Sequence, residues 1–117
     1  MLSWTAARKH ALSFPEAEEL DHFGSPSFRV KGKIFAQLSA RGVDRGRMLV
    51  KLPTQDQTAL LIMDPITFSS AEHWGKFGWT YVNLSTVDKQ VLVDLLTKSW
   101  RAIAPKTLIE KETGSGA

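Results

Sequence analysis

The chain has 117 residues, of which 15 are Lys or Arg and 12 are Asp or Glu, and its formal net charge is +3. It contains no cysteine, which excludes disulfides, thiolate catalysis, cysteine-based zinc sites and iron–sulfur clusters. The length suits one domain, and the longest apolar run, at residues 59–63, is too short to span a membrane. Arg8 and Lys9 stand where a signal peptide needs its apolar stretch, so we expect a cytoplasmic protein with no membrane contact.

The N-terminal residues predict one helix and then an acidic connector. Ser3 is a good N-cap residue, and Pro15 ends the helix. Between them, apolar residues recur at helical spacing: Trp4, Ala7, Ala11 and Phe14. Residues 16–21 are mostly acidic, and we expect an irregular connector there.

Three strands are expected next. Residues 28–30 and 33–38 flank Gly32, which indicates a hairpin turn. A three-residue loop at 30–32, with Gly32 left-handed, sets Phe28 opposite Ile34. One face of the hairpin then holds Phe28, Ile34, Ala36 and Leu38, and the other Ser27, Arg29, Lys33, Phe35 and Gln37. After a loop at 40–46, residues 47–52 form a strand with Met48, Val50 and Leu52 on one side and Arg47, Leu49 and Lys51 on the other.

The C-terminal half predicts two helices around a strand. Thr54 and Gln57 form a capping-box pattern for a helix that ends at Asp64, and Ala59, Leu60, Ile62 and Met63 are its apolar side. Residues 68–77 are irregular or a short strand, and residues 79–84 form a strand. Ser85 with Asp88 caps the last helix, which Pro105 closes. A wide apolar stripe runs down that helix: Val87, Val91, Leu92, Leu95, Leu96, Trp100 and Ile103.

These elements give the order α-β-β-β-α-β(β)-α. We expect a single α+β domain over residues 3–108, with a mostly antiparallel sheet and helices packed on one face. Residues 109–117 have little to anchor them, and we expect a disordered C-terminal tail.

No pattern in the sequence indicates a catalytic or metal site. The three histidines, His10, His22 and His73, form no paired ligand spacing, and the acidic residues lack the pattern of a calcium loop. Neither a nucleophile-elbow motif nor a phosphate-binding glycine loop occurs. We therefore expect a non-enzymatic protein with no metal and no cofactor.

The positive charge is concentrated in one part of the chain. Residues 29–51 hold seven basic residues and one acidic residue, whereas the parts before and after them are slightly acidic. On the predicted strands, Arg29, Lys33, Arg47 and Lys51 fall on the face away from the core, with Phe35 and Leu49 at its apolar centre. Such a surface can follow phosphates, with the adjoining loops as wings that reach a groove. The alternative is an ordinary solvated strand face.

A second feature is the run WGKFGW at residues 74–79. Its aromatic side chains, at Trp74, Phe77 and Trp79 beside Lys76, could form a platform for a base, a sugar or a protein partner. The interpretation that we favour is a glycine turn whose rings pack back onto the sheet, because Trp79 also begins an alternating strand. We therefore keep a protein-interaction or small-ligand module as the alternative function.

Several motifs together resemble those of the MmcQ/YjbR family. They are HFGSPSFRVKGKIFA at residues 22–36, MDPITF at 63–68, WGKFGW at 74–79 and SWRAIAPK at 99–106. The resemblance covers residues 3–108 and implies a small bacterial α+β domain similar to the frataxin-like and secretion-chaperone-like folds. It also implies DNA binding through a double-wing arrangement, and it supplies no catalytic residues. Frataxin-type iron binding is not implied, because the first helix here carries Arg8, Lys9 and His10 instead of acidic residues.

We therefore expect a monomer or weak dimer that binds double-stranded DNA. Arg29, Lys33, Arg47 and Lys51 would contact phosphates, and Phe35 would stack or wedge. Lys31 belongs to the same basic surface, and Arg41 and Arg45 would lie at a wing tip.

Overall fold

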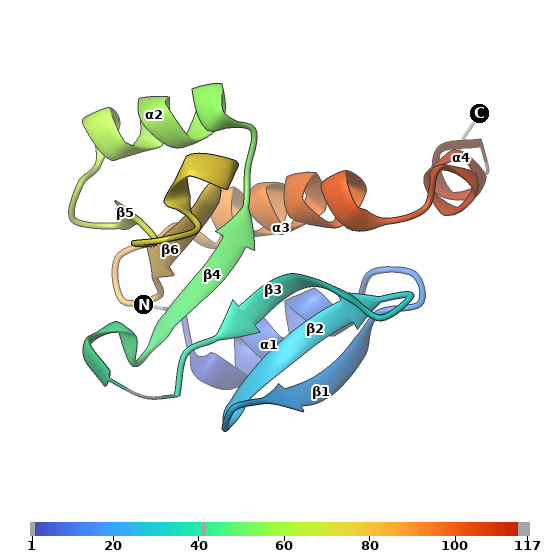
Figure 1. The fold of residues 1–117 in the computed structure, drawn as a ribbon, viewed down its shortest axis with the longest axis horizontal. Coiled ribbons are helices and arrows are strands. Elements are labelled where there is room, and N and C mark those ends of the chain that lie inside the picture. The colour runs from blue at the N-terminus through green and yellow to red at the C-terminus, as the bar shows by residue number, and fades with distance from the viewer. Residues whose placement is uncertain (1, 41, 115–117) are drawn as a thin grey trace.

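The computed structural model describes residues 2–40 and 42–114. Its strands form one six-stranded antiparallel sheet in the order β1-β2-β3-β4-β6-β5 (Figure 1). The strands are β1 (Glu18–His22), β2 (Ser25–Val30), β3 (Lys33–Leu38), β4 (Arg47–Lys51), β5 (Phe68–Ser70) and β6 (Trp79–Asn83). The α-helices are α1 (Trp4–Leu12), α2 (Thr54–Met63), α3 (Lys89–Ile103) and α4 (Lys106–Gly114), and η1 (Gly42–Asp44) and η2 (Gly75–Phe77) are short 3₁₀ turns.

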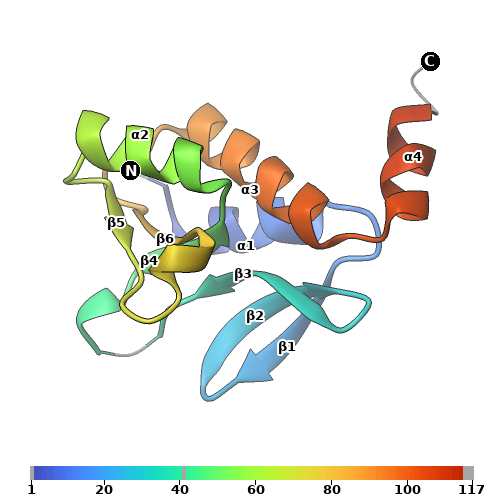
Figure 2. The same ribbon diagram turned by 45° about the horizontal axis from the view of Figure 1, so that its top comes forward.

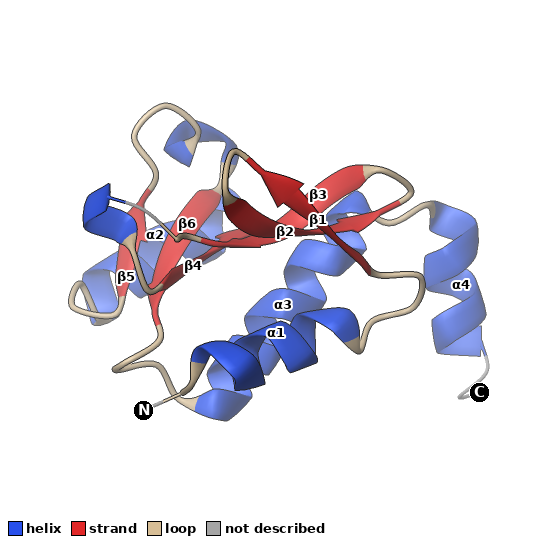
Figure 3. Ribbon diagram, turned by 90° about the horizontal axis from the view of Figure 1, so that it is seen from below, coloured by secondary structure: helices blue, strands red, loops and turns tan. Residues whose placement is uncertain are grey.

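The core lies between the sheet and two helices. Figure 3 shows α1 and α3 side by side on one face of the sheet, and α2 packs against β5. The core is formed by fully buried side chains from β2, β3, β4, β6 and α3, which include Phe28, Val30, Ala36, Leu38, Met48, Val50, Val82, Leu92, Leu96 and Trp100. The predicted α+β class and antiparallel sheet are confirmed, and the expected elements follow in the predicted order, with β1 and α4 in addition. We call the sheet face away from α1 and α3 the open face.

Helices α1 and α3 each begin at a capping side chain. The Ser3 hydroxyl accepts a hydrogen bond from the Ala6 amide at 3.0 Å, as predicted. The Asp88 carboxylate accepts from the amides of Gln90 and Val91, so Asp88 alone, without Ser85, is the cap of α3.

The predicted capping box of α2 is wrong. Pro53 occupies the N-cap position without a side-chain hydrogen bond, and Gln57 is buried, where its amide donates to the Trp79 carbonyl oxygen at 3.2 Å. The apolar side predicted for α2 is correct at Leu60, which packs against the core, and wrong at Ala59, Ile62 and Met63, which are exposed.

The acidic segment predicted as a connector contains a strand. Residues Glu18–His22 pair with β2, with Glu18 opposite Arg29 and Leu20 opposite Ser27. Their side chains are exposed or half-buried. The strand therefore owes its existence to backbone pairing at the sheet edge, which an acidic composition does not reveal.

The predicted hairpin register is wrong at two points. The turn has two residues, Lys31 and Gly32, both with positive φ (52° and 81°), so Val30 lies opposite Lys33. A bulge then inserts Phe35 as an unpaired residue, because Arg29 lies opposite Ile34 while Phe28 lies opposite Ala36. As a result, Ile34 moves to the open face and Phe35 turns into the core, where it is fully buried.

At the C-terminus, helix α4 extends to Gly114 and so enters the segment for which the sequence predicts a disordered tail. In Figure 1, α4 lies beyond the end of α3, at the opposite end of the molecule from α2. Among the described residues, no helix combines the length and apolarity needed to cross a bilayer.

Candidate binding site on the open sheet face

One row of side chains crosses all six strands on the open face. The cross-strand pairs connect Leu20, Ser27, Gln37, Leu49, Tyr81 and Ser69, in the order β1 to β5. Figure 1 looks onto this face, with α1 and α3 behind the strands. The open face is therefore amphipathic, with an amide, hydroxyls and apolar side chains along one line.

A hollow of about 260 Å³ lies on this face. We call it the aromatic hollow; it is lined by His22, Ile34, Gln37, Leu49, Trp74 and Trp79. Trp79 is half-buried and Trp74 is 61% exposed. Neither indole is therefore buried against α3, and both border a space that a ligand can enter.

A close backbone approach holds the turn beside this hollow. The Leu52 amide donates to the Gly78 carbonyl oxygen at 2.9 Å, and Gly78 has φ 95°. A Cβ atom at Gly78 would lie 1.9 Å from the Leu52 carbonyl oxygen, so only glycine fits here. The Trp79 amide also donates to the Trp74 carbonyl oxygen at 3.3 Å. The turn is thus seated against the end of β4, and Figure 2 shows η2 (yellow) in front of β4 and β6.

His22 Nδ1 in the aromatic hollow lies 3.4 Å from Arg29 Nη2, whereas the other polar side chains of the hollow are free to bind. Within the described part of the chain, the Gln37 side-chain amide has no hydrogen-bond partner, although this residue is half-buried. The indole N–H groups of Trp74 and Trp79 have no partner among the same residues. A ligand that fills the hollow can therefore hydrogen-bond to the Gln37 amide both as a donor and as an acceptor.

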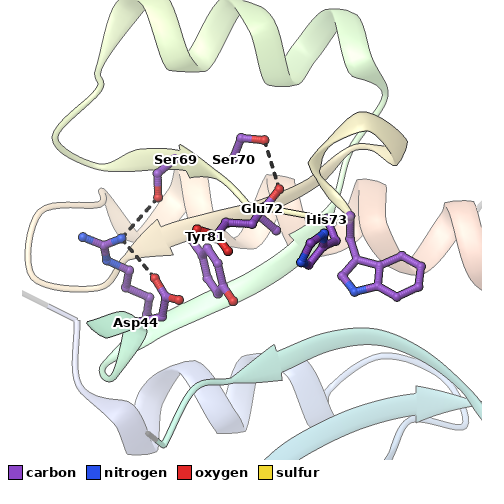
Figure 4. Close-up of a pocket in the computed structure, with 9 residues that line it drawn as sticks. Asp44, Ser69, Ser70, Glu72, His73 and Tyr81 are labelled. Atoms are coloured by element: carbon purple, nitrogen blue, oxygen red, sulfur yellow. Dashed lines mark hydrogen bonds and ion pairs between the residues drawn. The ribbon is translucent and has the colours of Figure 1, made fainter. Parts of the chain in front are cut away.

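A second hollow of about 430 Å³ adjoins the first and shares Trp74 with it. We call it the polar hollow; it is lined by Asp44, Arg47, Ser69, Ser70, Ala71, Glu72, His73, Trp74 and Tyr81 (Figure 4). Arg47 Nη1 lies 3.4 Å from Asp44 Oδ1 and 3.3 Å from Ser69 Oγ. Burial raises the pKa of Tyr81, and the charge and hydrogen bond of Asp44 raise it further.

Several predicted DNA contacts do lie on the open face. Arg29 and Arg47 are half-buried there, as the strand alternation predicts, but each is already engaged. Arg29 Nε donates to Ser27 Oγ at 3.1 Å, and its Nη2 lies 3.4 Å from His22 Nδ1, while Arg47 pairs with Asp44. Lys51 lies directly opposite Trp79, and its ammonium makes no ion pair with any described residue.

The other predicted contacts are dispersed. Lys31 lies in the hairpin turn, where its Nζ is 2.7 Å from Glu16 Oε1. This pairing raises the pKa of Lys31 through the hydrogen bond and charge of Glu16. Lys33 lies opposite Val30, so its assignment to the same face as Arg29 is wrong. Arg45 is exposed beside η1, and Arg41 lies outside the described residues.

Phe35 cannot stack on or wedge into DNA in this structure. It is fully buried, with its ring 6.0 Å from that of Phe14 in an edge-to-face arrangement. The bulge that inserts this residue into β3 is the reason for the error.

The aromatic run at residues 74–79 fits each of the two sequence interpretations in part. Trp79 packs back onto the sheet, whereas Trp74 and Phe77 are exposed, with ring centroids 6.3 Å apart. Lys76 Nζ lies 5.2 Å from the Phe77 ring centroid.

Sequence reasoning missed the contribution of His22 and Ile34 to the aromatic hollow. The alternation along β3 and β4 predicted that Gln37 and Leu49 lie on the open face, but it did not predict that Trp74 borders the same hollow.

In the described residues, no group of three or more His, Asp and Glu side chains is arranged to hold a metal ion. The lining of the aromatic hollow offers two indole rings for stacking, and the Gln37 amide and the His22 ring for hydrogen bonding.

Comparison with known proteins identifies one family. The family model described as YjbR matches residues 12–102. No curated protein matches the chain. A crystal structure of a Deinococcus radiodurans protein with the domain named DUF419 superposes with a TM-score of 0.79 at 23% identity, covering 97% of this chain and 89% of that one. A protein from Pseudomonas syringae gives a TM-score of 0.69 at 18% identity, covering 86% of this chain and 98% of the other. At these identities the two structures support the fold alone.

Proposed function

The chain belongs to the YjbR family, and we propose that it is a non-catalytic binding protein whose ligand site is the open face of the sheet. One observation carries the proposal: Trp74 and Trp79 border a hollow of about 260 Å³ on the sheet face that α1 and α3 leave free. Ligand sites are typically concave and apolar with a few placed polar groups. The aromatic hollow has this composition, with Ile34, Leu49 and the two indoles as its apolar lining and Gln37 and His22 as its polar residues.

The side chains of the aromatic hollow favour binding over bond-making chemistry. Indole rings offer flat faces that stack on other π systems, and an amide can donate and accept at once. A ligand with one flat ring system can therefore be held by contact with Trp74 and Trp79 while Gln37 fixes its orientation.

Nuclear magnetic resonance with small planar probes tests this proposal. Indole, adenosine and N-acetyltryptophanamide are added separately to the ¹⁵N-labelled protein. At least one probe should shift the indole N–H signals of Trp74 and Trp79 and the side-chain amide signal of Gln37. Trp74→Ala should weaken the effect, whereas Met63→Ala should leave it unchanged, because Met63 is an exposed apolar residue on α2 that lines neither hollow. If no probe shifts these signals, the aromatic hollow is not a binding site.

Double-stranded DNA is a second candidate ligand of the same face. It is favoured by the position of Arg29, Arg47 and Lys51 on the face that α1 and α3 do not cover. The pairing of Arg47 with Asp44 reduces the net charge that phosphates would meet. Lys51 differs from Arg29 and Arg47 because its charged group has no hydrogen-bond or ion-pair partner among the described residues.

Duplex affinity at several salt concentrations tests the second candidate. Binding at ~50 mM salt should weaken steeply as salt is raised, because phosphate contacts release counterions. An Arg47→Glu/Lys51→Glu double variant should lose binding. The charge-matched control is Lys89→Glu/Arg101→Glu on α3, which lies on the other side of the sheet. Absence of binding at low salt, or an equal loss in the control, rejects duplex binding.

A further inference from the structure

We infer that the aromatic hollow is a pocket for one unpaired nucleotide, whose base enters between Trp74 and Trp79 and whose phosphate meets Lys51. This inference rests on the proposed function, since it names the ligand class of the same site. It differs from duplex binding, because a base within a duplex is stacked and paired and cannot enter a pocket.

The unpartnered polar groups select against a purely apolar ligand. Gln37 is half-buried and lines the aromatic hollow, and its amide has no hydrogen-bond partner in the described chain. An apolar ligand would cover this amide without replacing the hydrogen bonds that water makes to it, which is unfavourable. A nucleobase presents donors and acceptors at its edge, and a glutamine side chain can bind such an edge through both of its polar atoms.

The size of the aromatic hollow suits one ring system. Sites that bury a drug-sized ligand have volumes of roughly 300–1,000 Å³, and the aromatic hollow has about 260 Å³. Trp74 is shared with the polar hollow, which Asp44 and Glu72 line, so an uncharged part of a ligand, such as a sugar, has a second space beside the ring. A single nucleotide, or one nucleotide of a longer single strand, satisfies both conditions.

Charge complementarity supplies the phosphate contact. Lys51 lies directly opposite Trp79 on the same face of the sheet, where paired residues have Cβ atoms about 4.5–5.5 Å apart. Its ammonium makes no ion pair within the described residues. Arg29, opposite Ile34 in the β2–β3 hairpin, is a second cation beside the aromatic hollow. A phosphate attached to a bound base can therefore meet positive charge at the rim.

Tryptophan fluorescence titration tests the inference with defined probes. They are the four ribonucleoside monophosphates, a DNA and an RNA hexamer of the same sequence, and the duplex formed by the DNA hexamer with its complement. A mononucleotide or a single-stranded hexamer should quench tryptophan emission, and the single strand should bind at least ~10-fold more tightly than the duplex. Equal affinity for the mononucleotide and the hexamer identifies a free nucleotide as the ligand. Higher affinity for a hexamer identifies a single strand, and the hexamer with the higher affinity shows whether that strand is DNA or RNA.

Variants locate the base and the phosphate. Gln37→Leu keeps the side-chain volume and should lower the affinity roughly 10-fold. Lys51→Ala should lower it and reduce the slope of affinity against salt by about one phosphate contact. Trp74→Ala removes an exposed stacking ring and should lower the affinity about 10-fold or more, and Met63→Ala, at an exposed apolar residue that lines neither hollow, is the control.

The experiments separate an error in the nucleotide assignment from an error in the binding site itself. If neutral planar probes shift the Trp74 and Trp79 signals but no nucleotide or single strand binds, the site stands and the nucleotide assignment is wrong. Tighter binding of the duplex than of the single strand also overturns it. If no probe of any kind perturbs the aromatic hollow, the proposed function itself fails.

Discussion

The hydroxyl of Ser99 on α3 donates a hydrogen bond to the carbonyl oxygen of Phe35, the extra residue of the bulge in β3. The same hydroxyl accepts from the Lys51 amide at 2.8 Å, and Ser99 is fully buried. One side chain of α3 thus ties the bulge of β3 to the end of β4. This tie helps to set which residues reach the open face, because the bulge turns Phe35 inward and Ile34 outward.

Replacing Ser99 with alanine should destabilise the protein by about 2 kcal/mol or more. The variant leaves a buried carbonyl and a buried amide without partners, and each unsatisfied group costs roughly 1–3 kcal/mol. Urea unfolding measures the change in the free energy of unfolding. Ser85→Ala is the control, because Ser85 is exposed. A loss for Ser99→Ala no larger than for Ser85→Ala would show that the bulge is held by other contacts.

Gly78→Ala should destabilise the protein by at least ~2 kcal/mol and distort the turn that carries Trp74. The added Cβ would lie 1.9 Å from the Leu52 carbonyl oxygen, at a φ of 95°. Gly46→Ala separates the two causes, because Gly46 has φ 86° with nothing within 4 Å of the added Cβ. Gly46→Ala should cost only ~1 kcal/mol, the strain of the left-handed conformation. Thermal unfolding of both variants gives the comparison, and equal losses would contradict the close approach at Gly78.

Trp100→Phe should destabilise the protein by about 1–3 kcal/mol. Trp100 is fully buried, its Nε1 donates to the Pro15 carbonyl oxygen at 3.2 Å, and its ring stacks on Phe14 with centroids 6.0 Å apart. Phenylalanine keeps an aromatic ring but loses the hydrogen bond and part of the volume. Trp74→Phe is the matched control at an exposed indole, and chemical unfolding should show almost no change for it. A neutral Trp100→Phe would mean that this indole is not a core contact.

Local patterns predicted the parts of the fold that depend on neighbouring residues. Ser3 begins α1, period-two alternation places Arg47, Leu49 and Lys51 on the open face, and an apolar stripe forms the core side of α3. These features depend on residues a few positions apart, so a sequence pattern carries them.

The parts that were missed depend on residues far apart in the chain. Strand β1 forms by pairing with β2, and the bulge at Phe35 is hydrogen-bonded to a serine 64 residues away. The candidate site has the same origin, since Trp74 reaches it through the contact of Gly78 with Leu52. Gln37 was placed on the right face by alternation, but its lack of a partner follows only from the packed structure.

Tyr81 should ionise above the ordinary tyrosine pKa of about 10. Burial raises the pKa of the phenol, and the nearby Asp44 carboxylate disfavours the phenolate further. Tyr81 is the only tyrosine in the chain, so phenolate absorbance during an alkaline titration reports this group alone. Asp44→Asn should lower the pKa of Tyr81, because it removes the negative charge and leaves Arg47 unpaired beside the phenolate. Asp94→Asn, on α3, should leave it unchanged.

The same shift makes the stability of the protein depend on alkaline pH. Because folding raises the pKa of Tyr81, its contribution to the free energy of unfolding is fully present below pH ~10 and is lost as the pH rises through the folded-state pKa. Urea unfolding between neutral and alkaline pH should therefore show a smaller loss of stability for Tyr81→Phe than for the unmodified protein. Equal losses in the two proteins, or a Tyr81 pKa that Asp44→Asn does not lower, would contradict the polar hollow as described, with the phenol of Tyr81 beside the carboxylate of Asp44.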